Sequence, residues 1–278
     1  MNGVQRICFI GAGSMSEAML AGLLKNRLIT ADRVSVFNRH RRERLTELKK
    51  SYGVQIPEDR GRAVSEADTV ILAVKPKDVQ EALTQWKTSF HRGQRIISVA
   101  AGISTEAVER LIPSGIPVIR AMPNTSCTIG QSATALCTGR WAGPEDLEVA
   151  RRLFSAIGSA VIVEEEAMDS VTALSGSGPA YIYFMVEALE QAGVEAGLSK
   201  EIARQLSLQT LFGAAHMLME TREEPAELRR RVTSPGGTTM AGLEELKRKR
   251  FDEAVKSAVL RAKSRSRELG SLLGQEAK

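Results

Sequence analysis

RICFIGAGSMS, residues 6–16, decides how the first half of the chain is interpreted. Its first five residues form an apolar run without polar alternation, which is typical of a parallel strand covered on both faces. Gly11 and Gly13 interrupt this run, and an apolar pattern of helical period follows at 19–24. The order of strand, glycine turn and helix matches the dinucleotide-binding pattern G-x-G-x-x-G, with Ser16 at the third glycine position. We therefore expect a nucleotide cofactor at this turn.

Each small residue of this turn is required by the geometry of the turn or of the bound cofactor. The first glycine permits a tight turn, the second lets a pyrophosphate approach the N-terminus of the helix, and a small third residue keeps helix and strand close. Glycine turns between strands and helices are common, but this one follows a clear strand and precedes a clear helix near the start of the chain. The cofactor-binding residues predicted in this turn are Gly11, Gly13, Ser14 and Met15.

Strands and helices continue to alternate as far as residue 163. Apolar runs predict further strands at 33–37, 68–74, 95–99, 117–120, 131–137 and 160–163, and helical patterns stand between them, as at 79–86 and 144–154. This alternation is typical of an α/β protein with a doubly wound parallel sheet of the Rossmann type. A cofactor lies against the C-terminal ends of such strands, so we predict that it is bound by residues at those ends: Ala73, Val74, Lys75, Pro76, Ala100 and Ala101.

The end of the second predicted strand indicates which cofactor is used. A site for NAD places an acidic residue there to accept the ribose 2′-hydroxyl, but this chain has no acid before Glu43. Arginines stand close by instead, and a 2′-phosphate would pair with them. We therefore predict NADPH, with NADH as the alternative, and assign Asn38 and Arg39 to its binding. For Arg41 and Arg42 the interpretation as the start of a charged surface helix stays open.

The pattern changes after the glutamates at 164–166, since only helices are predicted beyond them. They are expected at 179–197, 200–220, 226–232, 238–247 and 251–269. We place the domain boundary here, with a dinucleotide-binding domain at 1–164 and an all-helical dimerisation and substrate domain at 165–278. Residues 206–219 are apolar nearly all round, a pattern typical of a helix buried on every side. The helical part is too small to bury it alone, so we expect a homodimer at least.

Two glycine-rich turns, SGSGPA at 175–180 and SPGGTT at 234–239, each lead into an apolar helical run. Such turns offer unpaired backbone N–H groups and hydroxyls to a small anion. An N-cap is the simpler interpretation of 234–239, but two glycines and two threonines exceed what a cap requires. Asn124 follows a strand on the same rim, where a turn asparagine is the ordinary interpretation. The predicted substrate-binding residues are Ser234, Gly236, Gly237, Thr238, Asn124 and Ser175.

Five phrases occur in order along the chain: FIGAGSM at 9–15, AVKP at 73–76, RAMPNT at 120–125, LSGSGPAY at 174–181 and VTSPGGTT at 232–239. Together they resemble the pyrroline-5-carboxylate reductase family over nearly the whole chain, and the last two phrases are specific to it. The resemblance implies reduction of 1-pyrroline-5-carboxylate to L-proline with NAD(P)H, the last step of proline biosynthesis. It also implies a swapped helical dimer that can assemble into a ring of dimers such as a decamer.

The same resemblance assigns roles within the last phrase. Thr239 would hydrogen-bond the ring nitrogen of the substrate, as the catalytic residue, and the turn at 234–238 would hold the carboxylate. The chain departs from the family pattern at Ser126, where the family often has proline, and at Arg60, where asparagine is frequent near the adenosine. None of the departures removes a glycine or a threonine of the last phrase.

The chemistry of the residues favours imine reduction. A ketone yields an alkoxide that needs a proton donor. His40 and His91 stand in polar contexts, and His216 lies in an apolar helix where a hydrogen-bonded core role is the better interpretation. The helix at 181–198 lacks the lysine that hydroxyacid dehydrogenases place there, whereas hydride addition to a protonated C=N bond needs no such acid. An NADP-linked hydroxyacid dehydrogenase and a non-catalytic regulatory paralogue are the alternatives.

Composition limits the partners. The net charge of +5 is mild and aromatic residues are only 4%, which argues against nucleic acid. The chain shows no signal peptide, and the apolar helix at 181–198 carries three glutamates, which argues against a membrane span. Cys8, Cys127 and Cys137 show no metal-ligand spacing, so we expect no metal and three buried or half-buried thiols in a reducing cytoplasm.

Overall fold

The computed structural model describes residues 6–275, and the side chains as far as residue 270. The chain forms two compact units. The first comprises the residues up to Ser177 together with those from Arg261 onward, and the second is Gly178–Leu260. The domain boundary that the sequence predicts between residues 164 and 165 stays a prediction.

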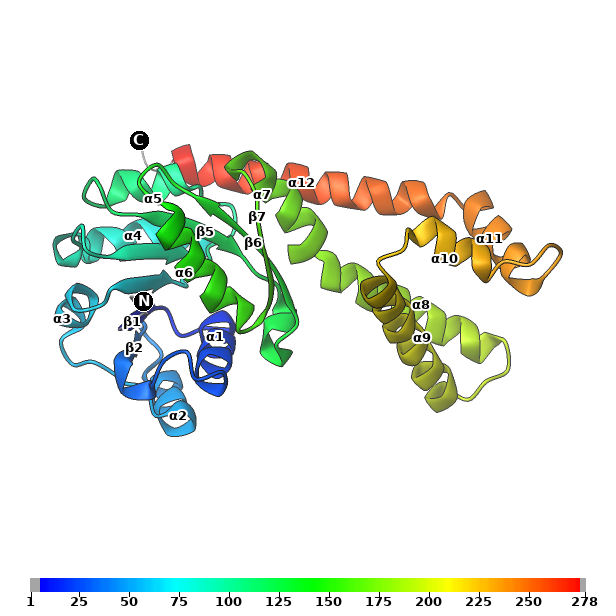
Figure 1. Ribbon diagram of the computed structural model, residues 1–278, viewed down its shortest axis with the longest axis horizontal. Coiled ribbons are helices and arrows are strands. Elements are labelled where there is room, and N and C mark those ends of the chain that lie inside the picture. Colours follow the sequence, from blue (N-terminus) through cyan, green and yellow to red (C-terminus); the bar gives the residue numbers. More distant parts are fainter. Residues whose placement is uncertain (1–5, 276–278) are drawn as a thin grey trace. The chain divides into compact units, whose positions relative to one another are not determined.

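The first unit is built on a seven-stranded sheet with the order β2-β1-β3-β4-β5-β6-β7 (Figure 1). The strands are β1 Ile7–Ile10, β2 Val34–Phe37, β3 Thr69–Leu72, β4 Arg95–Ser98, β5 Val118–Met122, β6 Ser132–Thr138 and β7 Gly158–Ile162. The predicted α/β fold with a doubly wound sheet is confirmed. One neighbouring pair, β5 and β6, is antiparallel, because a short 3-10 turn at Thr125–Ile129 joins these strands instead of a crossover helix.

Helices cover both faces of this sheet. Buried residues of α1, α2 and α6 form one apolar core against it, and those of α3, α4 and α5 form another on the opposite face. The central strands β1 and β3 are buried along their whole length, as their unbroken apolar runs predict. The bounds of the helices are α1 Ser14–Lys25, α2 Arg42–Tyr52, α3 Arg60–Ser65, α4 Val79–Gln85, α5 Thr105–Leu111 and α6 Pro144–Ser155.

The connections contain short helical turns. After β7 the chain continues through a 3-10 turn at Glu165–Ala167, α7 Met168–Val171 and a π-helical turn at Thr172–Gly176. Further 3-10 turns lie at Ala31–Arg33, Pro76–Asp78 and Lys87–Ser89.

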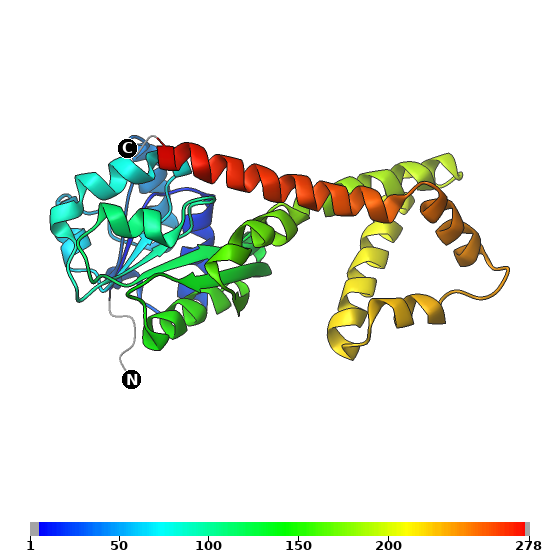
Figure 2. The same cartoon turned by 90° about the horizontal axis from the view of Figure 1, so that it is seen from above.

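The first unit is completed by the end of the last helix, α12 Phe251–Gln275. Ser266 is buried and its hydroxyl donates to Asp169 at 2.7 Å. Further along, a Cβ on Gly270 would lie 2.8 Å from the carbonyl oxygen of Gly102, so only a glycine lets the helix approach the loop after β4 this closely. Figure 2 shows this end of α12, in red, beside the helices that follow β3 and β4.

The second unit consists of helices only. They are α8 Gly178–Glu195, α9 Lys200–Thr221, α10 Pro225–Arg231, α11 Thr238–Arg248 and the first part of α12. The α8 and α9 helices approach closely where a Cβ on Gly193 would lie 2.9 Å from that of Ala203. All five helices expected from the sequence are present, with ends within two residues of the prediction except for the longer end of α12.

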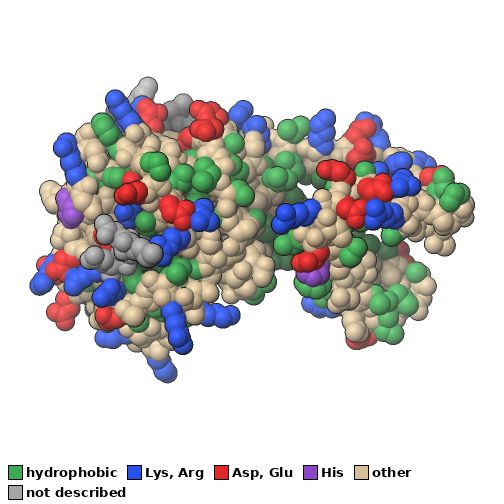
Figure 3. Space-filling view, in the orientation of Figure 1, with side chains coloured by type: hydrophobic (Ala, Val, Ile, Leu, Met, Phe, Trp, Pro, Cys, Tyr) green, Lys and Arg blue, Asp and Glu red, His purple; other side chains and the backbone are tan. Residues whose placement is uncertain are grey.

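The apolar side chains of the second unit are mostly uncovered. Leu206 is 53% exposed and Phe212 is 64% exposed, and Figure 3 shows apolar side chains open on the visible face of these helices. The sequence predicts that 206–219 is buried with the help of a partner subunit, so exposure in the single chain agrees with that prediction. His216 is also exposed in the single chain, where it stacks on Phe212, and its expected core role stays a prediction about the assembled protein.

Two smaller expectations concern the whole chain. All three cysteines are buried, as predicted. Among the residues that the structure describes, no helix has both the length and the apolar composition that a membrane crossing requires.

Candidate active site

The glycine turn after β1 has the geometry that its sequence predicts. Gly11 has φ +116°, and a Cβ there would overlap with the carbonyl of Ala73, so the end of β1 lies directly against the residues after β3. Gly13 is the N-cap of α1, with no side-chain cap and open space around its Cα. The first N–H groups of α1 thus have no side-chain cap, and the binding of a pyrophosphate by Ser14 and Met15 stays a prediction.

Ser16 shows why serine serves at the third position of the pattern. Its side chain is fully buried, and its hydroxyl donates to the carbonyl oxygen of Gly11 at 2.8 Å. This hydrogen bond ties the first turn of α1 to the end of β1. The residue thus stays small enough for close packing while it stabilises the glycine turn.

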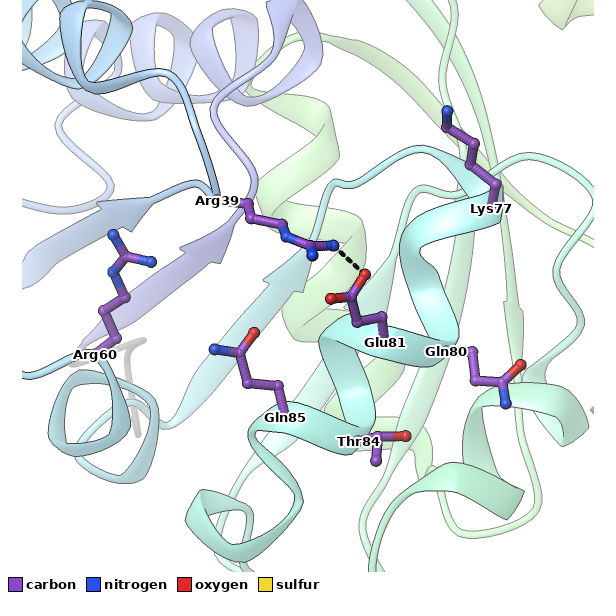
Figure 4. Close-up of a pocket in the computed structure, with 7 residues that line it drawn as sticks. All are labelled: Arg39, Arg60, Lys77, Gln80, Glu81, Thr84 and Gln85. Atoms are coloured by element: carbon purple, nitrogen blue, oxygen red, sulfur yellow. Dashed lines mark hydrogen bonds and ion pairs between the residues drawn. The ribbon is translucent and has the colours of Figure 1, made fainter.

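A pocket of about 650 Å³ opens beside the C-terminal end of β2 (Figure 4). Its charged side chains are Arg39, which follows β2, Arg60 at the start of α3, and Lys77 and Glu81 from the segment after β3. Gln80, Thr84 and Gln85 complete the lining. The pocket therefore contains three cationic side chains and one carboxylate, a balance suited to a phosphate group.

Arg39, which the sequence analysis assigns to cofactor binding, lines this pocket, but it already has a partner. Its guanidinium forms an ion pair with the carboxylate of Glu81 (Figure 4). Asn38 does not line the pocket, because its side-chain amide is bonded at both ends to the backbone of Arg41, at 3.0 Å each. Asn38 thus shapes the turn that carries Arg39.

The sequence interpretation missed Lys77 and Glu81 and noted Arg60 only as a departure from a family pattern. Glu81 stands 42 residues beyond Arg39, so no local motif connects the two. The predicted fold could have pointed to them. In a sheet with the order β2-β1-β3, the segment after β3 lies near the end of β2.

The residues predicted at the ends of β3 and β4 lie on one rim. The two strands pair in parallel with Leu72 opposite Ser98, so the segments 73–76 and 100–101 emerge side by side. Ala100 is buried and Ala101 is exposed. The prediction that these segments border a cofactor rests on this placement next to the glycine turn.

Two predicted substrate-binding residues are brought together although they stand 51 positions apart. The side-chain amide of Asn124 donates to the carbonyl oxygen of Ser175 at 3.1 Å, and its oxygen accepts from the N–H of Ser126 at 3.1 Å. Asn124 therefore connects the segment after β5 with the π-helical turn. The ordinary interpretation as a turn asparagine is also correct, since the same side chain organises its own turn.

An ion pair between a buried arginine and a half-buried glutamate supports this junction. Arg120 on β5 is only 6% exposed in its side chain and donates to Glu165 at 2.5 Å. The same carboxylate accepts from the hydroxyl and N–H of Thr105, at 2.8 and 3.2 Å, and from the thiol of Cys137 at 3.4 Å. Glu165 thus joins β5, β6 and the start of α5 to the segment that leads to Ser175.

The protonation of this cluster follows from its contacts. Burial by itself raises the pKa of the Glu165 carboxyl, but the hydrogen bonds from Arg120 and Thr105 outweigh it and leave the pKa below its ordinary value of 4.5. Burial, together with the nearby Glu165 carboxylate, raises the pKa of the Cys137 thiol to about 12. The carboxylate is therefore charged and the thiol neutral at physiological pH. The sequence interpretation took Glu165 only as a marker of the domain boundary.

The turn at 234–239 lies in the second unit. Gly236 has φ +69°, and the N–H of Gly237 donates to the carbonyl oxygen of Ser234 at 3.1 Å. Gly237 is the N-cap of α11 and has no side-chain cap, and a Cβ there would overlap with the hydroxyl of Ser234. Thr238 and Thr239 are exposed in the first turn of α11. An uncapped helix start flanked by hydroxyls is suited to bind a carboxylate.

The chain is similar to known proteins over nearly its whole length. Residues 165–269 match the family model for pyrroline-5-carboxylate reductase dimerisation, and residues 6–102 match that for NADP oxidoreductase, coenzyme F420-dependent. Pyrroline-5-carboxylate reductase 1 of Bacillus spizizenii is 43% identical over 265 residues, which is 95% of this chain and 89% of the relative. The chain belongs to the pyrroline-5-carboxylate reductase family.

Solved structures of pyrroline-5-carboxylate reductases agree in fold. The structure from Coxiella burnetii has a TM-score of 0.89 and is 35% identical in sequence. The match covers 96% of this chain and 99% of the Coxiella chain. The structure from Plasmodium falciparum, which has NADP bound, has a TM-score of 0.85 and is 28% identical in sequence. The match covers 97% of this chain and 99% of the Plasmodium chain. The helical part of the present chain is thus a pyrroline-5-carboxylate reductase dimerisation domain.

Proposed function

We propose that this chain reduces the C=N bond of 1-pyrroline-5-carboxylate to give L-proline, with NADPH as the preferred hydride donor and NADH as the alternative. The reaction is the last step of proline biosynthesis, and we place it in the cytoplasm. The observation that carries the proposal is the turn at 234–239, whose uncapped helix start and exposed threonine hydroxyls suit a small carboxylate with an adjacent nitrogen. Membership of the reductase family supports it.

The first unit offers a place for each part of the cofactor. The start of α1, with Gly13 at its N-cap, suits the pyrophosphate, and the cationic pocket with Arg39 suits the adenosine end. The nicotinamide would lie along the strand ends, where the candidate residues are Ala73, Val74, Lys75, Pro76, Ala100 and Ala101. The bound cofactor supplies the hydride, and the protein supplies binding and orientation.

The second unit would bind the substrate. The backbone N–H of Thr238, at the uncapped start of α11, and the hydroxyl of Ser234 would hold its carboxylate, and Gly236 and Gly237 would let the backbone approach it closely. The hydroxyl of Thr239 would hydrogen-bond the ring nitrogen and orient the C=N bond. Hydride addition to a protonated C=N bond yields a neutral amine, so no side chain has to deliver a proton in that step. Positioning is therefore the main task of the protein.

Assembly is part of the proposal. The matched dimerisation domain and the uncovered apolar side chains of α8 and α9 support a homodimer in which each copy covers these helices of the other. We further propose that dimers assemble into a ring, such as a decamer. Asn124 and Ser175, in the first unit, are the remaining candidates for substrate contact.

The test follows the absorbance of NADPH with purified protein and pyrroline-5-carboxylate. Thr239→Val should lower kcat by about 100-fold, the usual cost of removing a donor at the reacting atoms, while NADPH affinity is unchanged. Thr239→Ser should recover much of the rate. Thr233→Val is the matched control, because that hydroxyl donates to the carbonyl oxygen of Arg229 outside the turn.

Other outcomes would contradict the proposal. Oxidation of a 3-hydroxy acid with NADP, without turnover of the imine, would identify a hydroxyacid dehydrogenase. Binding of NADPH without any turnover would identify a regulatory paralogue. A loss of cofactor affinity in Thr239→Val would show that 234–239 is not the substrate turn.

A further inference from the structure

The adenosine end of the proposed cofactor site contains a carboxylate that its own strand does not supply. The segment after β2 has no acid before Glu43, which argues for NADPH and against NADH. Glu81 of α4 nevertheless reaches the same place, where it forms an ion pair with Arg39 (Figure 4). The structure thus supplies, from another element, the kind of group that an NADH site requires.

Both partners of this pair are accessible. The side chain of Arg39 is 59% exposed and that of Glu81 is 54% exposed, and both line the pocket with Arg60 and Lys77. A solvated ion pair of this kind contributes little to stability, so an arriving ligand can separate it at small cost. The pair can therefore exchange partners when a cofactor binds.

We propose that Glu81 is a specificity-determining residue for the cofactor. With NADH, its carboxylate accepts a hydrogen bond from the ribose 2′-hydroxyl while Arg39 remains its partner. With NADPH, the 2′-phosphate takes Arg39, and Glu81 loses its partner and faces a second anion. Glu81 thus strengthens the binding of NADH and weakens that of NADPH. It thereby reduces the preference for NADPH that the three cationic side chains create. The proposal rests on the dinucleotide-binding part of the proposed function.

The expected change in cofactor affinity is small, because the side chain of Glu81 is exposed to solvent. Removing one unit charge a few ångströms from the phosphate changes its affinity by about fivefold in water, and salt reduces that change. Glu81→Gln removes the charge but keeps the size and one acceptor oxygen. We therefore expect the variant to bind NADPH about fivefold more tightly and NADH more weakly.

The experiment measures the dissociation constants of both cofactors by fluorescence titration of the intact protein at low and high salt. The matched control is Glu148→Gln, on α6, where the carboxylate pairs with Arg151 and is 50% exposed. Glu81→Gln should raise the preference for NADPH over NADH by about tenfold at low salt and by less at high salt. The control should leave both constants unchanged.

Arg39→Gln supplies the second arm of the test. It should weaken NADPH binding and leave NADH binding nearly unchanged. Adding Glu81→Gln to it should still tighten NADPH binding by about fivefold, because the removed charge lies near the phosphate whether or not Arg39 is present. An unchanged or reduced preference for NADPH in Glu81→Gln would overturn the proposal. Failure of both dinucleotides to bind would overturn it together with the cofactor assignment.

The proposed reaction can fail independently. Because the titrations contain no pyrroline-5-carboxylate, a protein that binds both cofactors but does not reduce the imine would contradict the proposed function and leave the assignment of Glu81 intact.

Discussion

The two compact units of this chain differ in how much of their apolar surface the chain itself covers. In the first unit, Phe9, Ile71 and Phe154 are fully buried between sheet and helices. In the second unit, residues 178–260, Val186 and Ala203 are the buried hydrophobic residues, while Phe184 and Met219 are each 73% exposed. The first unit therefore has a core of its own, whereas the second leaves most of its large apolar side chains uncovered, and we expect it to need another surface for stability.

The difference has a simple physical origin. A sheet between two layers of helices buries apolar residues on both of its faces, whereas two packed helices cover only the stripe between them. Each large apolar side chain left in water forgoes about 1.5–3 kcal/mol of burial. The proposed substrate turn at 234–239 belongs to the second unit, so we expect its order to depend on association.

The largest effect is expected from a charge on the uncovered face. Phe212→Asp should raise the dissociation constant of the dimer by about 100-fold or more, since loss of a large aromatic anchor costs up to several kcal/mol and a factor of 100 corresponds to about 2.7 kcal/mol. Reductase activity should fall with it. Sedimentation and turnover are measured over the same range of protein concentration.

Trp141→Asp, at an exposed aromatic residue of the first unit, is the matched control. It should leave both assembly and activity in place. A fully active monomer of Phe212→Asp would show that the second unit needs no partner.

The next effect is expected inside the first unit. Glu165→Gln leaves the buried Arg120 without its counter-charge, so the free energy of unfolding should fall by about 3 kcal/mol. Urea denaturation at fixed protein concentration measures it. Glu227→Gln removes an exposed partner of Arg230 in the second unit and should cause no measurable change. If both substitutions lowered the free energy of unfolding equally, the ion pair of the first unit would be no more important for stability than the one in the second.

The same carboxylate predicts a dependence on pH. Because the pKa of Glu165 is lower in the folded than in the unfolded chain, its stabilising contribution is complete above the ordinary value of 4.5. That contribution is lost as the pH falls from there through the lowered pKa. Acid should therefore destabilise the unaltered protein more steeply than Glu165→Gln, as measured by urea midpoints at several pH values. Parallel curves would remove Glu165 as the source.

The smallest effect is an expected absence of reaction. Burial raises the pKa of the Cys8 thiol to about 12, and burial with the Glu165 carboxylate does the same for Cys137. Neither thiol should be alkylated in the native protein at about pH 8, since the thiolate is the reactive form. Both should react after unfolding in guanidinium, and mass spectrometry follows the modification. Rapid native alkylation would show that the core of the first unit opens.

Much of the fold could be predicted because its signals are local. The apolar runs of β1 and β3 and the glycine turn at Gly11 and Gly13 each lie within a dozen residues, and the structure has them where the pattern indicates. The antiparallel β6 was not foreseen, since an apolar strand of that length looks the same in either direction. The exposure of His216 in the single chain is consistent with the prediction that a partner subunit covers its apolar helix.

The candidate site divides in the same way. The turn at 234–239 and the start of α1 were predictable, because the residues that would bind an anion are consecutive there. By itself, the sequence determined the α/β order, the position of both glycine turns that we propose to bind anions, and the arginine after β2. Only the tertiary structure decided that Glu81 meets Arg39, that Asn124 meets Ser175 and that Glu165 joins three elements. Such pairs depend on which strands become neighbours in the sheet, and sequence spacing does not encode that order.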